Sequence, residues 1–166
     1  MVREHAAAIV NLARAMTGSD TDADDLAQET FVRAWRGFTK FRGESTILTW
    51  LHGIALNVIR THHAKRSRAG RLFGVLARRE ADDEDPLEQM PAGEDLEGRL
   101  AARDAIDRAL AALPEDLRET LVLRDIQGLE YREISAVLGI PIGTVESRIF
   151  RARQRLKPML EEVRKR

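Results

Sequence analysis

Apolar residues recur with the spacing of an α-helix along most of this chain, and no segment shows the strict alternation of a half-buried strand. One expected helix runs from a cap at Asp20 or Thr21 to Gly37. The others span about residues 3–16, 47–65, 95–113, 114–126, 131–138 and 143–155. No apolar run approaches the roughly 20 residues that cross a bilayer, so we expect no membrane insertion. The predicted fold class is all-α.

An acidic stretch divides the chain of 166 residues into two halves. Residues 80–97 carry nine acidic and no basic side chains, with prolines at positions 86 and 91. Self-repulsion and proline oppose a compact fold here, which predicts an acidic flexible linker. We therefore expect two small helical domains, residues 1–79 and 98–166, joined by this linker.

The formal net charge is zero, but the charges are segregated. Residues 1–79 carry 13 basic and 7 acidic side chains, and residues 98–166 carry 14 and 11. Between Asn57 and Arg79 there are seven Lys or Arg residues and no acid. Such a block indicates a polyanionic partner, and a solvated helix face is the alternative. We expect the acidic linker to shield the basic surfaces, so that the free protein binds DNA poorly.

The sequence does not show the residue patterns that are typical of enzymes. The chain has no cysteine, which excludes disulfides, thiolate zinc sites and thiol nucleophiles. It shows no nucleophile–base pair, phosphate-binding glycine loop or cluster of metal ligands. The side chains of the adjacent His62 and His63 diverge on a helix, so they are expected to extend a phosphate-facing surface. We expect no enzyme, no cofactor and no metal.

Two short helices near the C-terminus indicate a helix-turn-helix. Gly139-Ile140-Pro141 separates them, and Gly139 permits the positive φ that this turn needs. Small Ser135 stands where the helices cross, and Val145 is spaced to enter the core. The alternative is a helical hairpin with a purely structural role.

The second of these helices should present a basic face to a DNA groove. Arg148, Arg151 and Arg155 lie at positions i, i+3 and i+7. Arginine contacts phosphates and guanine edges in the major groove.

Three stretches together resemble the extracytoplasmic-function (ECF, group 4) sigma factors of the sigma-70 family. They are Asp25–Trp35, then Phe41–Ser45 with Thr49–Asn57, and lastly Leu113-Pro114 with Tyr131–Ile134 and Gly143–Arg153. The resemblance identifies them with the region 2 polymerase-docking helix, the minus-ten loop and helix, and the region 4 helix-turn-helix. It covers nearly the whole chain in the order of the family.

The resemblance implies a dissociable sigma factor that directs promoter-specific transcription initiation in a stress or envelope response. Its implied partners are the β′ clamp and β flap of bacterial core RNA polymerase, promoter DNA and an anti-sigma factor. The expected location is the cytoplasm, where an anti-sigma factor can hold the chain at the inner membrane face. The alternative is a stand-alone helix-turn-helix regulator with an N-terminal partner-binding domain, against which the first two stretches argue.

Three sets of site residues follow from the resemblance. The set for core polymerase is Asp25, Gln28, Glu29 and Arg33. The set for the minus-ten element is Arg42, Gly43, Ser45, Thr46, Asn57, Arg60 and Thr61. The set for the minus-thirty-five element is Thr144, Glu146, Ser147, Arg148, Phe150, Arg151 and Arg155, with Glu146 standing where many relatives carry Arg or Lys.

Helical spacing also predicts which aromatic side chains lie in the core. Asp25, Gln28 and Glu29 share one face, and Phe31 and Trp35 are expected on the opposite, buried face. Trp50 is spaced with core positions of its helix and is likewise expected to be buried.

Overall fold

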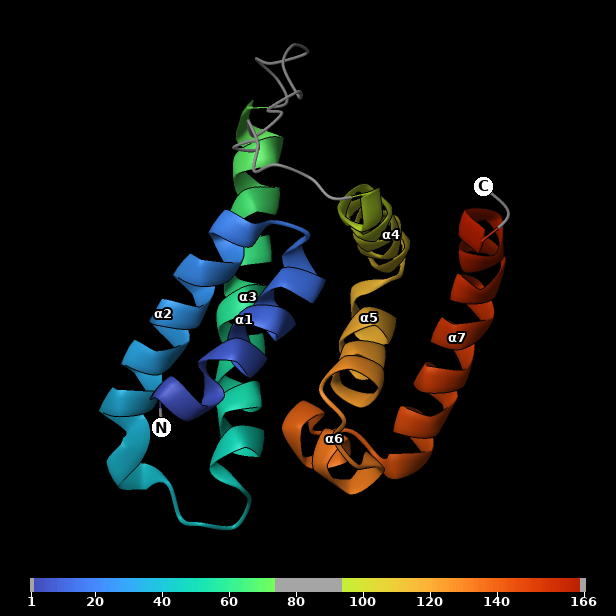
Figure 1. Ribbon diagram of the computed structural model, residues 1–166. Helices are drawn as coiled ribbons and strands as arrows, with labels where there is room; N and C mark the ends of the chain where they lie inside the picture. Colours follow the sequence, from blue (N-terminus) through green and yellow to red (C-terminus); the bar gives the residue numbers. More distant parts are fainter. Residues whose placement is uncertain (1, 74–93, 165–166) are drawn as a thin grey trace.

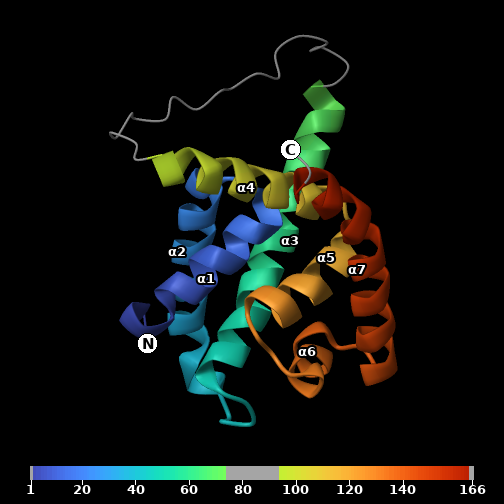
Figure 2. The ribbon, with the colours of Figure 1, turned by 45° about the vertical axis from the view of Figure 1, so that its right-hand side comes forward.

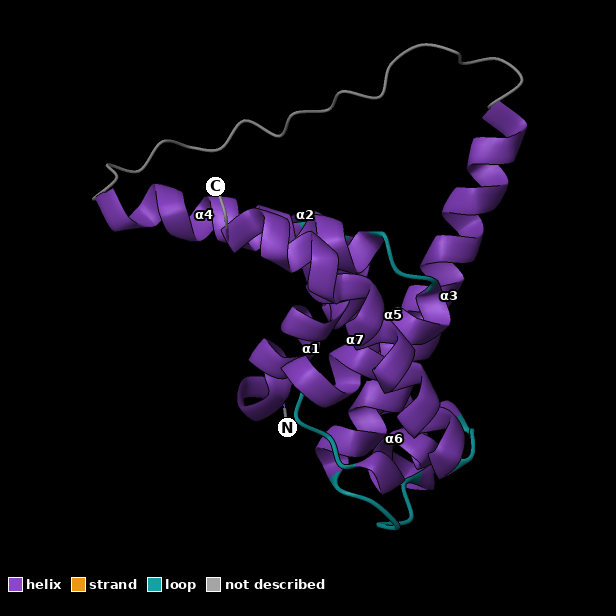
Figure 3. Ribbon diagram, turned by 90° about the vertical axis from the view of Figure 1, so that its right-hand side faces the viewer, coloured by secondary structure: helices purple, strands orange, loops and turns teal. Residues whose placement is uncertain are grey.

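The computed structural model describes residues 2–73 and 94–164, and all regular structure within these ranges is helical, as Figures 1 and 3 show. The predicted all-α class is confirmed. The elements are α1 (Val2–Thr17), α2 (Asp20–Gly37), the 3₁₀-helix η1 (Phe38–Lys40), α3 (Ile47–Phe73), α4 (Glu94–Ala111), α5 (Glu115–Leu121), the π-helix η2 (Val122–Ile126), α6 (Tyr131–Leu138) and α7 (Ile142–Arg164). Among these described helices, none combines the length and apolar character needed to cross a membrane.

The N-terminal half is a three-helix bundle of α1, α2 and α3 (Figure 1). Its core is filled by one apolar stripe from each helix. The buried members are Ile9, Leu12, Ala13, Met16, Ala23, Leu26, Ala27, Ala34, Leu51, Ala55, Leu56, Val58 and Ile59. This burial holds α3 in place and leaves its opposite side exposed for other contacts.

Side-chain caps define where α2 and α3 begin. The cap of α2 is Ser19, whose hydroxyl accepts from the Asp22 N–H at 3.1 Å. The prediction of Asp20 or Thr21 was wrong, because a cap needs an extended backbone and only Ser19 has it (φ −125°, ψ 125°). Thr46 accepts from the Thr49 N–H at 3.0 Å and caps α3.

The C-terminal half contains the expected helix-turn-helix. Gly139 takes a left-handed conformation (φ +66°), and the Ser135 hydroxyl donates to the Ile140 carbonyl at 2.5 Å across the turn. Val145 is fully buried, as its spacing predicted. The turn therefore fixes the angle at which α7 leaves α6.

The two halves pack against one another and share one hydrophobic core. Helix α4 contacts both α1 and α7 (Figure 2). In addition, η2 packs on α1, and α6 packs on α3. Of the predicted linker, residues 80–93 lie outside the described residues, and residues 94–97 form the start of α4.

We predict that Gly139→Ala lowers the free energy of unfolding by about 1 kcal/mol, because an L-residue with a Cβ is strained at φ +66°. No atom beyond the adjacent residues lies within 4 Å of the added Cβ, so the expected cost is backbone strain and not a clash. The matched control is Gly53→Ala in the interior of α3, where φ is not positive, which should raise stability by roughly 0.5–1 kcal/mol. Urea unfolding measures both, and equal changes would contradict the prediction.

Candidate functional site

The four side chains predicted for core polymerase form an exposed patch on α2. Asp25, Gln28, Glu29 and Arg33 are all solvent-exposed. Arg33 Nε donates to Glu29 Oε1 at 2.7 Å, one turn along the helix. Such an exposed i,i+4 pair adds only about 0.3–0.5 kcal/mol, so these groups remain available to a partner.

Trp35 is not in the core, contrary to prediction, but is 77% exposed. It follows Gln28 by seven residues and so lies on the same side of α2. Ala34 takes the core-facing position in this turn and Phe31 is half-buried. With exposed Val32 and Phe38, Trp35 adds an apolar strip beside the polar patch. The i, i+7 spacing from Gln28 was the signal in the sequence that could have found it.

Trp50 is half-buried and packs against the core, which bears out its prediction only in part. Its ring lies 5.1 Å from that of Phe41 and 6.3 Å from that of Phe38, between ring centroids. This aromatic cluster anchors the segment before α3 to the helix. The predicted minus-ten loop is therefore held at its base.

The loop itself is exposed at most of the predicted positions. Arg42, Gly43 and Ser45 face solvent, and Gly43 has φ +72°. Thr46 differs because its hydroxyl is occupied, with the Thr49 N–H at 3.0 Å and the Thr49 hydroxyl at 2.8 Å. The Thr46 side chain therefore caps α3 and is not free for a base.

Asn57 and Thr61 lie one turn apart on the exposed side of α3, where the Thr61 hydroxyl donates to the Asn57 carbonyl at 2.8 Å. The same side continues along the helix to exposed Lys65, Arg68 and Arg71. Figures 1 and 3 show this end of α3 extending away from the bundle. The structure thus joins two predicted minus-ten residues to a basic stripe.

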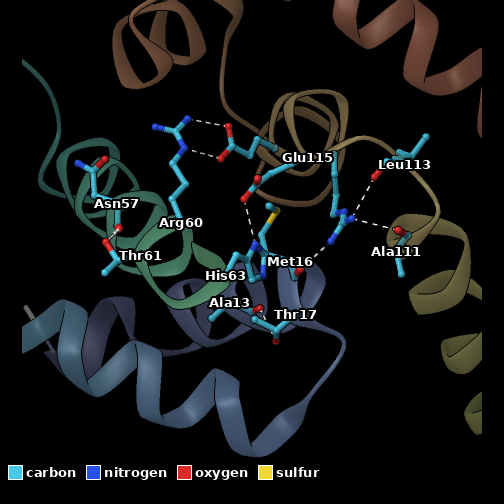
Figure 4. A network of polar contacts seen from close by, with 12 residues as sticks. Ala13, Met16, Thr17, Asn57, Arg60, Thr61, His63, Ala111, Leu113 and Glu115 are labelled. Carbon is cyan, nitrogen blue, oxygen red and sulfur yellow. Dashed lines mark hydrogen bonds and ion pairs between the residues drawn. The ribbon is translucent and has the colours of Figure 1, made fainter. Parts of the chain in front are cut away.

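Arg60, predicted to contact the minus-ten element, points to the other half of the protein. Its Nε and Nη2 donate to the two carboxylate oxygens of Glu119 on α5, both at 2.6 Å (Figure 4). Glu119 is buried, and its hydrogen bonds raise the pKa of Arg60. In this arrangement Arg60 is engaged by a carboxylate, although 42% of its side chain remains exposed.

The two adjacent histidines also face carboxylates, not a phosphate-binding surface as predicted. His63 Nδ1 lies 2.9 Å from Glu115 Oε1 on α5, and His62 Nε2 lies 3.6 Å from Asp22 Oδ2 on α2. Arg66, further along α3, donates to the same Asp22 at 2.8 Å. Neighbouring helices supply these acids, which the order of residues along α3 did not reveal.

Arg118 ties α5 to α1. Its guanidinium donates to the carbonyls of Met16 (2.9 Å), Ala111 (3.0 Å) and Leu113 (3.0 Å), as seen in Figure 4. Burial lowers the pKa of Arg118. One cation thus satisfies backbone oxygens near the ends of α1 and α4.

Two more polar contacts join α3 to the C-terminal half. The Thr49 hydroxyl donates to Glu133 Oε1 at 2.8 Å, and His52 Nε2 lies 3.1 Å from the Gln127 side-chain amide. Hydrogen bonds from the Glu130 N–H and then Thr49 lower the pKa of Glu133. His52 is fully buried, and this burial lowers its pKa.

The predicted minus-thirty-five residues on α7 divide into two groups. Phe150 is 63% exposed, and Glu146, Ser147, Arg151 and Arg155 are exposed as well. By contrast, Thr144 and Arg148 are half-buried.

Arg148 lies 3.5 Å from Asp116 on α5, so it does not extend the exposed face as predicted. Arg153, which was not among the predicted residues, forms a two-bond pair with Asp125 at 3.1 and 2.6 Å.

Comparison with known proteins assigns the chain to a family. The sigma-70 region 2 family matches residues 1–69, and the sigma-70 region 4 family matches residues 103–156. The chain belongs to the sigma-70 family, and its relatives place it among the ECF sigma factors.

The relatives cover most of both sequences. The RNA polymerase sigma-H factor of Pseudomonas aeruginosa is 40% identical over 151 residues, which are 85% of this chain and 76% of that protein. The ECF RNA polymerase sigma-E factor of Escherichia coli is 38% identical over 135 residues, covering 80% and 71%.

Two solved structures resemble the chain over both of its halves. One is the sigma factor RpoE in complex with the anti-sigma factor NepR from Bartonella quintana (TM-score 0.75, 27% identity, 96% of this chain and 94% of that chain). The other is CnrH in complex with the cytosolic domain of CnrY (TM-score 0.69, 29% identity, 97% and 85%).

Stability should fall as the pH decreases from about 6.5, because burial lowers the pKa of His52 below its usual value of 6.5. The folded chain keeps His52 neutral where the unfolded chain protonates it, so the unfolded state binds more protons. Glu133 and His5 are the charged neighbours that act on it, in opposite directions. Urea midpoints at about pH 7.5 and 5.5 measure the loss for the wild type and for His52→Gln. An equal loss in both proteins would contradict the assignment to His52.

Proposed function

We propose that this protein binds core RNA polymerase through α2 and directs it to promoters through two DNA-binding surfaces. The observation that carries the proposal is the exposed patch on α2, which spans Asp25 to Trp35. A stand-alone regulator that uses only its helix-turn-helix has no need of this second surface. Sigma-factor membership supports the same reading.

The α2 patch suits a protein partner because it combines charge with exposed aromatic area. Gln28 and Glu29 offer hydrogen-bond acceptors, and Trp35 offers a large apolar ring beside them. Aromatic residues are enriched among the side chains that dominate binding energy at interfaces. We assign this patch to the β′ clamp, and the C-terminal half to the β flap.

The minus-ten surface combines the exposed loop before α3 with the exposed side of α3. A base that leaves the duplex stack costs a few kcal/mol, which a protein pocket must offset. Gly43 permits close approach, Ser45 offers a hydroxyl, and Asn57 presents an amide. Lys65, Arg68 and Arg71 extend this surface for phosphates of the adjoining duplex.

The minus-thirty-five surface is the exposed side of α7. Ser147, Phe150 and Arg151 lie together on it and fit a major groove, where arginine recognises guanine and an apolar ring contacts a thymine methyl. Arg148 adds to this surface only after it leaves Asp116. We place the region 2 functions in α1–α3 and the region 4 functions in α4–α7.

An anti-sigma factor is the proposed regulatory partner. The two solved structures that resemble this chain over both halves are complexes with an anti-sigma factor and with the cytosolic domain of CnrY. The similarity in the placement of both halves supports a partner that recognises this closed arrangement.

Replacing Trp35 with Ala should weaken binding to core polymerase by roughly thirtyfold, the effect of a hot spot of about 2 kcal/mol. Stability should change by no more than about 0.5 kcal/mol, because the side chain is exposed. Competition with a labelled sigma factor for core enzyme measures the affinity. The control is Ile106→Ala, an exposed apolar side chain on α4. Equal affinities for the two variants would remove Trp35 from the interface.

Run-off transcription with core polymerase over a promoter library tests the function as a whole. Addition of the wild-type chain should produce transcripts from a defined set of promoters. The Arg151→Ala protein should lose roughly 1–3 kcal/mol of discrimination at one minus-thirty-five position. Arg153→Ala is the control, because Asp125 already engages Arg153. No promoter-dependent transcript with wild-type protein would refute the function, and unchanged preferences with Arg151→Ala would refute only the role of α7.

A further inference from the structure

Helix α5 carries three carboxylates, Glu115, Asp116 and Glu119, which we call the acidic edge. Glu119 holds Arg60 through two hydrogen bonds of 2.6 Å, and Glu115 lies 2.9 Å from His63. Asp116 lies 3.5 Å from Arg148 within the C-terminal half. The edge therefore engages cationic groups from both surfaces assigned to DNA.

The Arg60 contact has the geometry with which arginine also binds phosphate. A guanidinium fork binds a carboxylate or a phosphate through two parallel N–H donors. Arg60 donates from both Nε and Nη2 to the carboxylate of Glu119, so these two parallel donors are occupied. Glu119 is buried, whereas 42% of the Arg60 side chain is exposed, so release of Arg60 leaves the buried carboxylate without its partner. Arg60 cannot offer the same two donors to DNA at the same time.

Two further polar contacts of α3 with the C-terminal half act in the same direction. Thr49 on Glu133 and His52 beside Gln127 hold α3 against the C-terminal half at two further points. Each must separate if α3 moves away from α5. The release of Arg60 is thereby coupled to opening of the whole interface.

We infer that the acidic edge of α5 is an internal binding surface that competes with promoter DNA for Arg60 and His63. The inference rests on the proposed function, because that function assigns α3 to DNA. The free chain is closed, and DNA gains Arg60 only when α5 releases α3. Carboxylates of α5 thus lower the DNA affinity of the free protein, an effect that the charge pattern of the sequence predicted for the acidic linker.

The apparent association constant for DNA should equal that of the open molecule multiplied by the fraction of molecules that are open. If about one molecule in ten is open, the dissociation constant rises roughly tenfold. Removal of the competing carboxylate should lower the dissociation constant by the same factor. This makes the inference measurable without polymerase.

The test compares free full-length wild-type protein with Glu119→Gln, which keeps the side-chain size and removes the charge. X-ray scattering should show a larger radius of gyration for the variant. A short fluorescein-labelled duplex, titrated at constant salt, should bind it about tenfold more tightly. The matched control is Asp24→Asn, which removes one carboxylate charge from an exposed position of α2. It should change neither quantity. Unchanged compaction or unchanged DNA affinity in Glu119→Gln would overturn the inference.

A second variant identifies the shared group. Arg60→Gln should expand the chain as Glu119→Gln does, yet gain no DNA affinity, because the phosphate ligand is lost as well. If Arg60→Gln gains as much affinity as Glu119→Gln, competition for Arg60 is refuted. Glu119→Asp, which shortens the carboxylate arm, provides an independent opening variant if Glu119→Gln fails to fold. Failure of the sigma function would show separately, as absence of promoter-dependent transcripts with core polymerase.

Discussion

The ion pair between Arg60 and Glu119 joins the two halves at the place where each has a function. Two hydrogen bonds of 2.6 Å fix the direction of both side chains, and burial of Glu119 makes their separation costly. A pair with one buried partner adds little net stability, because desolvation of that partner offsets much of the attraction. Its stronger effect is on specificity, since losing either partner leaves a charge uncompensated. The pair therefore selects one arrangement of the halves.

Around this pair, polar contacts and apolar burial combine in a way that suits reversible closure. The shared core supplies the non-directional attraction, and the contacts of Thr49, His52 and Arg118 give it a defined register. Polar contacts can be exchanged for water or for a partner more easily than buried apolar area. An interface of this mixed kind can open when polymerase and DNA supply replacements.

The sequence predicted the local features of this protein well. Ser135 and Gly139 predicted the turn between α6 and α7. The turn needs a residue in the left-handed backbone conformation, which glycine adopts more readily than other residues. The family resemblance predicted that region 2 precedes region 4, and the family matches confirm that order. The prediction was wrong where two adjacent apolar residues could each have faced the core. Trp35 was assigned to the core by its helical spacing, whereas the small Ala34 takes the core-facing position in that turn.

The sequence by itself determined the helices, their caps to within one or two residues and the helix-turn-helix, because these depend on neighbours a few positions away. Only the tertiary structure decided what the charged side chains do. Arg60, Arg148 and His63 were all predicted to contribute to DNA-facing surfaces, and all three are engaged by carboxylates of α5. Their partners are distant in sequence from Arg60 and His63, and the folding of the two halves onto one core brings them together. Charge patterning along a chain reveals which side chains can bind an anion, but packing decides which anion is nearest.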